Sequence, residues 1–140
     1  MVEFNNEELL CIGKFEELTG AGVSDCIITE SSVIFIVLKG DLGKAIGRKG
    51  SNITRVRQAF ARPVFVFEDS DQAEHFIRNV FSNVTITNIN IYEKMNAKTA
   101  YVTVDEKDRG AAIGKGGERV KLGRALLLRK FNCDLKLLSK

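Results

Sequence analysis

The sequence predicts an α+β protein of two tandem domains, residues 1–68 and 69–140. Segments 43–50 (GKAIGRKG) and 110–117 (GAAIGKGG) match in register at a spacing of 67 residues in a 140-residue chain, and a repeat of half the chain indicates duplicated domains. Both halves also show the same order of apolar patterns. That order predicts helix, strand, strand, helix, helix, strand, with a three-stranded mixed sheet packed against helices.

The first half opens with good capping residues at 5–8, followed by apolar residues at helical spacing up to the glycines at 20–22. A helix is therefore expected there. Residues 23–29 and 33–39 are rich in β-branched side chains, which favour strands, and the polar residues between them predict a turn.

A short helical stretch is expected at 41–46, before a glycine-rich interruption. Ser51 or Asn52 is expected to cap the next helix, because both side chains accept hydrogen bonds from helix amides. Pro63 cannot continue a helix and should end it. Residues 64–67 then predict the third strand of the first domain.

The second half repeats this order. Asp71 and Glu74 are spaced as a capping box before a helix that reaches Phe81. The apolar phase slips between Ile86 and Ile89, which suggests a bulge. The remaining expected elements are strands at 84–91 and 99–104, a turn at 93–97, a helix at 118–131 and a strand that ends at Leu138.

Composition excludes several classes of protein. A hydrophobic fraction of 44% and a charged fraction of 28% are typical of a globular chain. The longest apolar run, residues 33–38, is far shorter than the roughly 20 residues that cross a bilayer. The first five residues lack the basic and apolar pattern of a secretion signal. We therefore expect a cytoplasmic protein with no membrane partner.

Catalytic and metal chemistry is not indicated. The three cysteines, Cys11, Cys26 and Cys133, form no closely spaced pair, and His75 is the sole histidine and reads as an ordinary helix residue. The second glycine segment lacks the spacing and the hydroxyl of a P-loop. The acidic residues at 105–108 precede a helix and are interpreted as caps. We expect no enzyme activity, metal, cofactor or small-molecule substrate.

Charge is distributed unevenly along the chain. Residues 1–30 hold seven acidic side chains and one basic one. Residues 39–62 hold seven basic and one acidic, and residues 107–130 hold eight basic and two acidic. Two basic centres therefore coincide with the two glycine segments, and local charge of this kind attracts polyanions.

Each glycine segment contains a Gly-x-x-Gly turn between two helices. Such a turn exposes backbone amides and the positive end of the following helix, and this combination attracts phosphate. A single four-residue glycine pattern is weak evidence. The duplication, the Ile that precedes each turn and the local basic charge together make a stronger signal.

Ile46-Gly-Arg-Lys-Gly50 and Ile113-Gly-Lys-Gly-Gly117 both resemble the I-G-x-x-G signature of K-homology (KH) domains. The element order is similar to the type II form, and two such units across the whole chain resemble archaeal NusA-like transcription factors. This resemblance implies a single-stranded RNA-binding factor of transcription elongation, termination or antitermination. It leaves no room for the additional domains of the larger bacterial relatives, which puts polymerase contact and full antitermination activity in doubt.

A KH domain binds about four nucleotides, with the glycine loop on the backbone and the bases in an apolar groove. Transferred to this sequence, the resemblance implies RNA contacts from the loops, from the Ile before each loop and from nearby basic residues. The expected RNA-binding residues are Gly47, Arg48, Lys49, Gly50, Gly114, Lys115, Gly116, Gly117, Ile46, Ile113, Lys44, Arg55 and Arg119. For Ile46 and Ile113, packing in the core is an equally good interpretation. For Arg55 and Arg119, the alternative is an exposed position on the helix in contact with solvent alone.

The matched pair Arg57 and Arg124 lies near the apolar stripe of each helix, and snorkelling over that stripe is the favoured interpretation. The phenylalanines fall on core positions and form no obvious platform for stacking bases, so packing is expected of them. We expect Phe35, Phe60, Phe65 and Phe67 to pack.

Two alternatives remain open. The KH pair could serve the ribosome or RNA processing, because such domains also occur there. The acidic first helix could instead contact a protein, with RNA polymerase as the candidate partner. A separate expectation concerns the junction: only residues 68–70 connect the last strand of one domain to the next helix, so the domains should be held in a fixed relation and bind one continuous strand.

Overall fold

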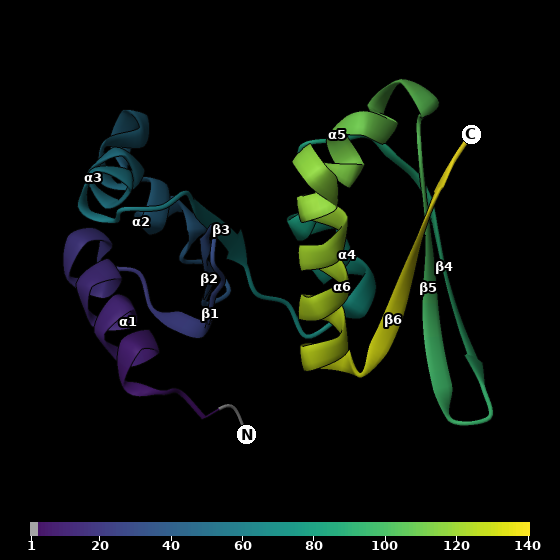
Figure 1. The fold of residues 1–140 in the computed structure, drawn as a ribbon, viewed down its shortest axis with the longest axis horizontal. Helices are drawn as coiled ribbons and strands as arrows, with labels where there is room; N and C mark the ends of the chain where they lie inside the picture. The colour runs from purple at the N-terminus through teal and green to yellow at the C-terminus, as the bar shows by residue number, and fades with distance from the viewer. Residues whose placement is uncertain (1–2) are drawn as a thin grey trace. The chain divides into compact units, whose positions relative to one another are not determined.

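The computed structural model describes residues 3–140, and Met1 and Val2 of the N-terminal segment considered above lie outside the described residues. The chain divides into two compact units, Met1–Asp69 and Ser70–Lys140. Each unit has a three-stranded sheet with helices against one of its faces (Figure 1). The predicted α+β class and element order are confirmed in both units.

The first unit begins with a helix that its own sequence caps. The Asn5 side chain accepts a hydrogen bond from the Glu8 amide at 2.8 Å, and Glu8 accepts one from the Asn5 amide at 2.9 Å. Gly20 ends the helix in the left-handed conformation. The elements of this unit are α1 Asn6–Thr19, β1 Val23–Ile28, β2 Val33–Val37, α2 Leu42–Ile46, the 3₁₀ turn η1 Arg48–Gly50, α3 Ser51–Ala59 and β3 Val64–Glu68.

The second unit has the same order, with longer strands and a longer last helix but a shorter first helix. They are α4 Ala73–Val80, β4 Ile86–Lys94, β5 Ala97–Val104, the 3₁₀ turn η2 Glu106–Asp108, α5 Arg109–Ile113, the 3₁₀ turn η3 Lys115–Gly117, α6 Glu118–Phe131 and β6 Cys133–Ser139. In each unit the central strand pairs antiparallel with the strand before it and parallel with the strand after it. The parallel pairing requires a crossover, and in each unit the two helices joined by the glycine turn supply it.

Two capping predictions are wrong. α3 begins after Gly50, which is its N-cap in the left-handed conformation, so neither Ser51 nor Asn52 caps it. α4 begins after Gln72 with no side-chain cap, so Asp71 and Glu74 form no capping box. The Ser70 hydroxyl instead accepts the Gln72 amide at 3.2 Å. The N-cap residues are therefore Gly50 and Gln72, not the residues that the sequence spacing predicted.

The β4–β5 hairpin is longer than predicted. Its strands continue to a two-residue turn at Met95 and Asn96, both with positive φ, which is the geometry that tight hairpins use. The register shifts between Ile86 and Asn88, which confirms the bulge predicted from the apolar phase.

The phenylalanines predicted to pack do so. Phe35 is fully buried, stacks on Phe15 with ring centroids 4.2 Å apart, and meets Phe60 edge-on at 5.6 Å. The rings of Phe65 and Phe67 lie 6.3 Å apart. In the second unit, Phe76 and Phe81 are buried, as are Leu126 and Leu127 of α6. These cores hold the helix pairs that carry the glycine loops.

Within residues 3–140, none of the helices combines the length and the apolar character that crossing a bilayer requires.

Candidate nucleic-acid interface

The two glycine loops have almost the same backbone. Gly47 has φ 77° and ψ 173°, and Gly114 has φ 79° and ψ 171°. The last glycines also agree, with φ 75° at Gly50 and 79° at Gly117. The sequence repeat is therefore also a repeat of conformation.

The first glycine of each loop cannot be replaced without moving the backbone. A Cβ on Gly47 would lie 2.8 Å from the amide nitrogen of Asn52, and one on Gly114 would lie 2.8 Å from the amide nitrogen of Arg119. Both positions have a positive φ, which side chains rarely adopt. The turn thus brings two helix ends closer together than any other residue type would allow.

Both helices that follow the loops have uncapped N-termini. Neither Gly50 nor Gly117 has a side chain, and no side-chain hydrogen bond caps α3 or α6. The first-turn amides of a helix lack partners within the helix and carry its positive partial charge. An anion placed at either loop would meet these amides.

The first loop adds two full positive charges to this site. Arg48 and Lys49 are both exposed, and Lys49 holds the left-handed conformation with φ 56°. Lys44 is exposed as well, and its ammonium lies 3.8 Å from a carboxylate oxygen of Asp41. Ile46, directly before the loop, is 40% exposed. The predicted set of residues 44 and 46–50 therefore lies at one end of the unit, with its cations in solvent.

The second loop carries less charge of its own. Lys115 is exposed, Gly116 takes the place of Lys49, and Ile113 is half-buried. One basic residue near this loop was not among the predicted set. The side chain of Lys121 passes the loop, with its Cε 3.7 Å from the position that a Cβ on Gly117 would occupy. Its position one helical turn after Gly117 was the signal that could have identified it.

Two of the predicted arginines have other partners. Arg55 is exposed and donates to the Asn52 side chain, which in turn donates to the Lys44 carbonyl at 2.7 Å. Arg119 is half-buried and donates to the Val80 carbonyl at 2.8 Å. Burial lowers the pKa of Arg119, because desolvation disfavours its cation. Arg119 thus supports the second loop from within the unit, and Arg55 helps to hold the helix side of the first loop.

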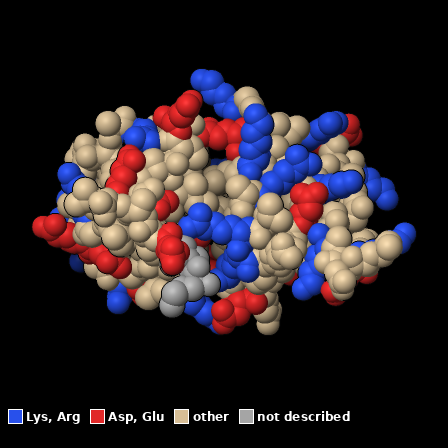
Figure 2. Space-filling model, turned by 60° about the horizontal axis from the view of Figure 1, so that its bottom comes forward, with Lys and Arg blue, Asp and Glu red and all other residues tan. Residues whose placement is uncertain are grey.

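The matched arginines Arg57 and Arg124 are both exposed, and within residues 3–140 only Arg124 has a polar partner. Arg124 donates from Nε to the Leu135 carbonyl at 2.9 Å. Figure 2 shows Lys and Arg side chains over much of one face, with Asp and Glu side chains between several of them and gathered at the left edge of the view.

The residues considered for metal or redox chemistry lie apart. Within residues 3–140, no group of three or more His, Cys, Asp or Glu is placed to hold a metal ion. Cys26 and Cys133 are buried, Cys11 is half-buried, and burial raises the pKa of both Cys11 and Cys133. His75 lies on α4 with Nδ1 3.1 Å from the Ser70 hydroxyl. The Asp105 side chain accepts the Lys107 amide at 3.3 Å and caps the turn η2, as predicted. Asp108, at the N-cap of α5, makes no side-chain cap there, because its carboxylate accepts the Thr85 amide at 3.0 Å instead.

The fold and the two loops define a protein of two tandem KH domains. Residues 12–71 match the KH domain family, and residues 73–136 match the family described as NusA-like second KH domain. A protein of Halococcus morrhuae named "Probable transcription termination protein NusA" is 36% identical over 95% of both chains. A protein of Methanocaldococcus jannaschii with the same name is 30% identical over 91% of this chain and 70% of its own.

A solved structure agrees with these relatives. The structure titled "Crystal structure of APE1850" superposes with a TM-score of 0.81 at 37% identity, and the match covers 98% of this chain and all of that one. The chain belongs to the family of archaeal NusA-like proteins with two KH domains.

Proposed function

We propose that this protein is an RNA-binding transcription termination factor whose two Gly-x-x-Gly loops hold single-stranded RNA. The observation that carries the proposal is the repeated loop conformation, which twice places an uncapped helix N-terminus beside exposed basic side chains. The names of its relatives, each a probable transcription termination protein, support the role in transcription.

The backbone of the RNA is the part that the loops bind in this proposal. A phosphate at the first loop would lie at the N-terminus of α3, where the positive partial charge of the helix favours an anion, and would be neutralised by Arg48 and Lys49. At the second loop, Lys115 and Lys121 would supply the charge. Amides and cations contact any phosphate, so this part of the interface binds RNA without regard to its sequence.

The bases would lie on the apolar side of each loop. Ile46 is exposed enough to contact a base, and Ile113 is partly exposed at the matching position. Paired bases cannot enter such a groove, so the ligand is single-stranded RNA. The mechanism needs no catalytic step, metal or cofactor, and a factor of this kind would act in the cytoplasm on nascent RNA during elongation, termination or antitermination.

The test replaces the loop cations in the intact protein. The combined variant Arg48→Asp, Lys49→Asp, Lys115→Asp and Gly116→Asp should lose binding of a ten-nucleotide single-stranded RNA, because each loop would repel phosphate. Asp tolerates the left-handed conformation, so the fold should survive, as circular dichroism can check.

The matched control changes charge elsewhere. Lys94→Asp with Lys98→Asp alters two exposed lysines of the β4–β5 hairpin and removes as much positive charge as Arg48→Asp with Lys49→Asp. RNA binding should persist in the hairpin control and fall in the first-loop double variant. An equal loss of RNA affinity in the two variants would show that the loops act only as part of a general basic surface, and this would contradict the proposal.

An exposed surface on α1 supports RNA polymerase as a protein partner. On α1, Leu10 is 76% exposed and Leu9 is 52% exposed, among the acidic residues Glu7, Glu16 and Glu17. Exposed apolar residues with an acidic rim are typical of a surface that contacts a protein rather than RNA. Capture of polymerase by the wild-type protein, and loss of capture with Leu10→Asp, would support this contact. Capture of ribosomes instead would favour the alternative role in translation.

A further inference from the structure

Arg57 and Arg124 occupy the same position relative to the two loops. Each lies seven residues after the last glycine of its loop, Gly50 or Gly117. Seven residues are close to two helical turns, so each arginine emerges from the same helix face as its loop, about 10 Å farther along the axis. This distance is within the reach of the four nucleotides that a KH domain binds.

In the second unit this arginine is bound to the protein itself. α6 continues for 14 residues to Phe131, and a single residue, Asn132, connects it to β6. This close connection brings the Leu135 carbonyl to 2.9 Å from Arg124 Nε. The guanidinium therefore binds one backbone carbonyl of the edge strand β6.

In the first unit the corresponding contact is missing. α3 has nine residues and ends at Ala59, and the loop 60–63 separates it from β3. The strand registers make Val64 the counterpart of Leu135, since Val64 pairs with Val33, Leu135 pairs with Ala100, and these partners lie 67 residues apart. No hydrogen bond or ion pair involves Arg57 within the part of the chain that the structure describes.

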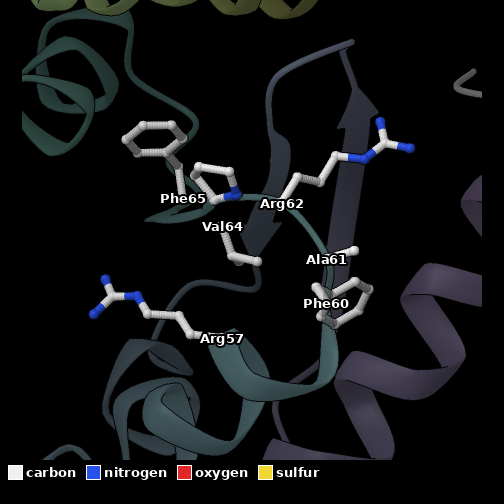
Figure 3. Close-up of a pocket in the computed structure, with 7 residues that line it drawn as sticks. Arg57, Phe60, Ala61, Arg62, Val64 and Phe65 are labelled. Atoms are coloured by element: carbon white, nitrogen blue, oxygen red, sulfur yellow. The ribbon is translucent and has the colours of Figure 1, made fainter.

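A pocket of about 490 Å³ lies beside Arg57, lined by that residue and by the segment 60–65. Figure 3 shows Arg57 and Phe65 on one side of Val64, with Phe60 and Arg62 on the other. Arg62 is engaged, because it donates to the Thr29 carbonyl and lies 3.6 Å from a Glu7 carboxylate oxygen. The pocket thus combines apolar walls with one guanidinium that is available to a ligand.

We propose that Arg57 reads one base of the RNA strand held by the first loop, with that base in the pocket formed by residues 60–65. The inference rests on the proposed function. The volume is within the range of small-ligand sites, and apolar walls with a guanidinium suit a flat, polar-edged base. The second unit, whose arginine is bound to Leu135, holds the backbone of the strand without reading a base at this position.

The chemistry of the guanidinium predicts the preferred base. Its two parallel N–H groups bind best to two adjacent acceptors. Guanine offers O6 and N7, and cytosine offers O2 and N3, whereas neither adenine nor uracil offers two adjacent acceptors. The first unit should therefore prefer guanine or cytosine at one position of the strand.

The experiment measures the affinity of the intact protein for the decamers (UG)₅, (UC)₅ and (UA)₅. Wild type should bind (UG)₅ or (UC)₅ about tenfold more tightly than (UA)₅, the size of one bidentate base contact. Arg57→Gln should reduce this ratio to about twofold or less. Arg57→Lys should also lose the preference while keeping the salt dependence, because lysine retains the charge but not the fork.

Arg124→Gln is the matched control and should leave the preference unchanged. The inference is overturned if wild type shows no preference, if Arg57→Gln keeps it, or if Arg124→Gln removes it equally. A failure of the proposed function gives a different result from a failure of this inference. In that case the wild-type protein would not bind RNA, or its RNA binding would survive the loop substitutions. Loss of binding in the loop variants with no effect of Arg57→Gln would overturn the base reading alone.

Discussion

The two KH units share the backbone of the glycine loop but differ in the basic side chains beside it. The φ angles of the matched first and last glycines agree within a few degrees, as at Gly47 with 77° and Gly114 with 79°. Beside this common backbone, the first loop carries Arg48 and Lys49, whereas the second carries Lys115 and depends on Lys121 of α6 for a further cation. The repeated feature is the loop conformation, which starts a helix without a side-chain cap in both units.

The helix after each loop differs more than the loop does. α6 has 14 residues where α3 has nine, and its extra turn brings Arg124 to the backbone of β6. The buried position of Val56 in α3 is taken by Gly123 in α6, where a Cβ would come 2.6 Å from the Phe81 ring. In the proposed interface, a duplicated unit would thus keep one contact with RNA while its second half diverges, and this would separate backbone binding from base reading.

The largest expected effect tests the loop backbone that the two units share. Gly47→Val and Gly114→Val should each destabilise the fold by about 3 kcal/mol, because each combines a positive φ with a Cβ that meets backbone. Gly116→Ala, with open space around it, should cost only about 1 kcal/mol. Chemical denaturation of the three variants gives the free energies of unfolding. Equal losses at Gly114 and Gly116 would show that close helix approach is not what the first glycine provides.

The next effect tests whether the two units act on one strand. An RNA of about ten nucleotides should bind the intact protein roughly 100-fold more tightly than one of four, because the second contact becomes intramolecular. Only residues 69–72 separate β3 from α4, so the effective concentration should be high. Arg48→Asp with Lys49→Asp should remove most of this gain. A gain that persists without the first loop would mean that one unit binds the longer RNA alone.

A smaller effect tests the difference in loop charge. Gly116→Lys gives the second loop the residue that Lys49 supplies in the first, and Lys49 shows that this conformation accepts lysine. We expect RNA affinity to rise about threefold to tenfold through one further phosphate contact. The reverse change, Lys49→Gly, should lower it by a similar factor. Titration of a fluorescent RNA measures both, and an unchanged affinity in both would show that this position does not face the ligand.

The smallest effect concerns Lys121. If its ammonium contacts a phosphate at the second loop, Lys121→Ala should reduce the slope of log affinity against log salt by about 0.7. Lys98→Ala, on the β4–β5 hairpin, serves as the control and should leave the slope unchanged. The measurement is a series of RNA titrations between low and physiological salt. Identical slopes for the two variants would place Lys121 outside the interface.

Much of the fold could be predicted because its signals are local. The glycine repeat, the β-branched runs and the apolar spacing predicted the element order that both units have, and the phase slip predicted the bulge between Ile86 and Asn88. The errors were at helix ends. Ser51 and Asn52 were expected to cap α3, but Gly50 already takes the left-handed conformation that starts the helix, and the Asn52 side chain bonds to the Lys44 carbonyl.

The sequence by itself determined the duplication, the two loops and the basic charge around them, because each depends on residues close together in the chain. Only the tertiary structure decided what each arginine does. Arg119 donates to a carbonyl 39 residues away, Arg124 donates to a strand that a single residue separates from its helix, and Arg57 lies beside a pocket. All three side chains carry the same guanidinium group. No local sequence pattern predicts which backbone carbonyl lies within hydrogen-bond distance of each one. That distance depends on how helix and strand pack, so it is settled only when the unit has folded.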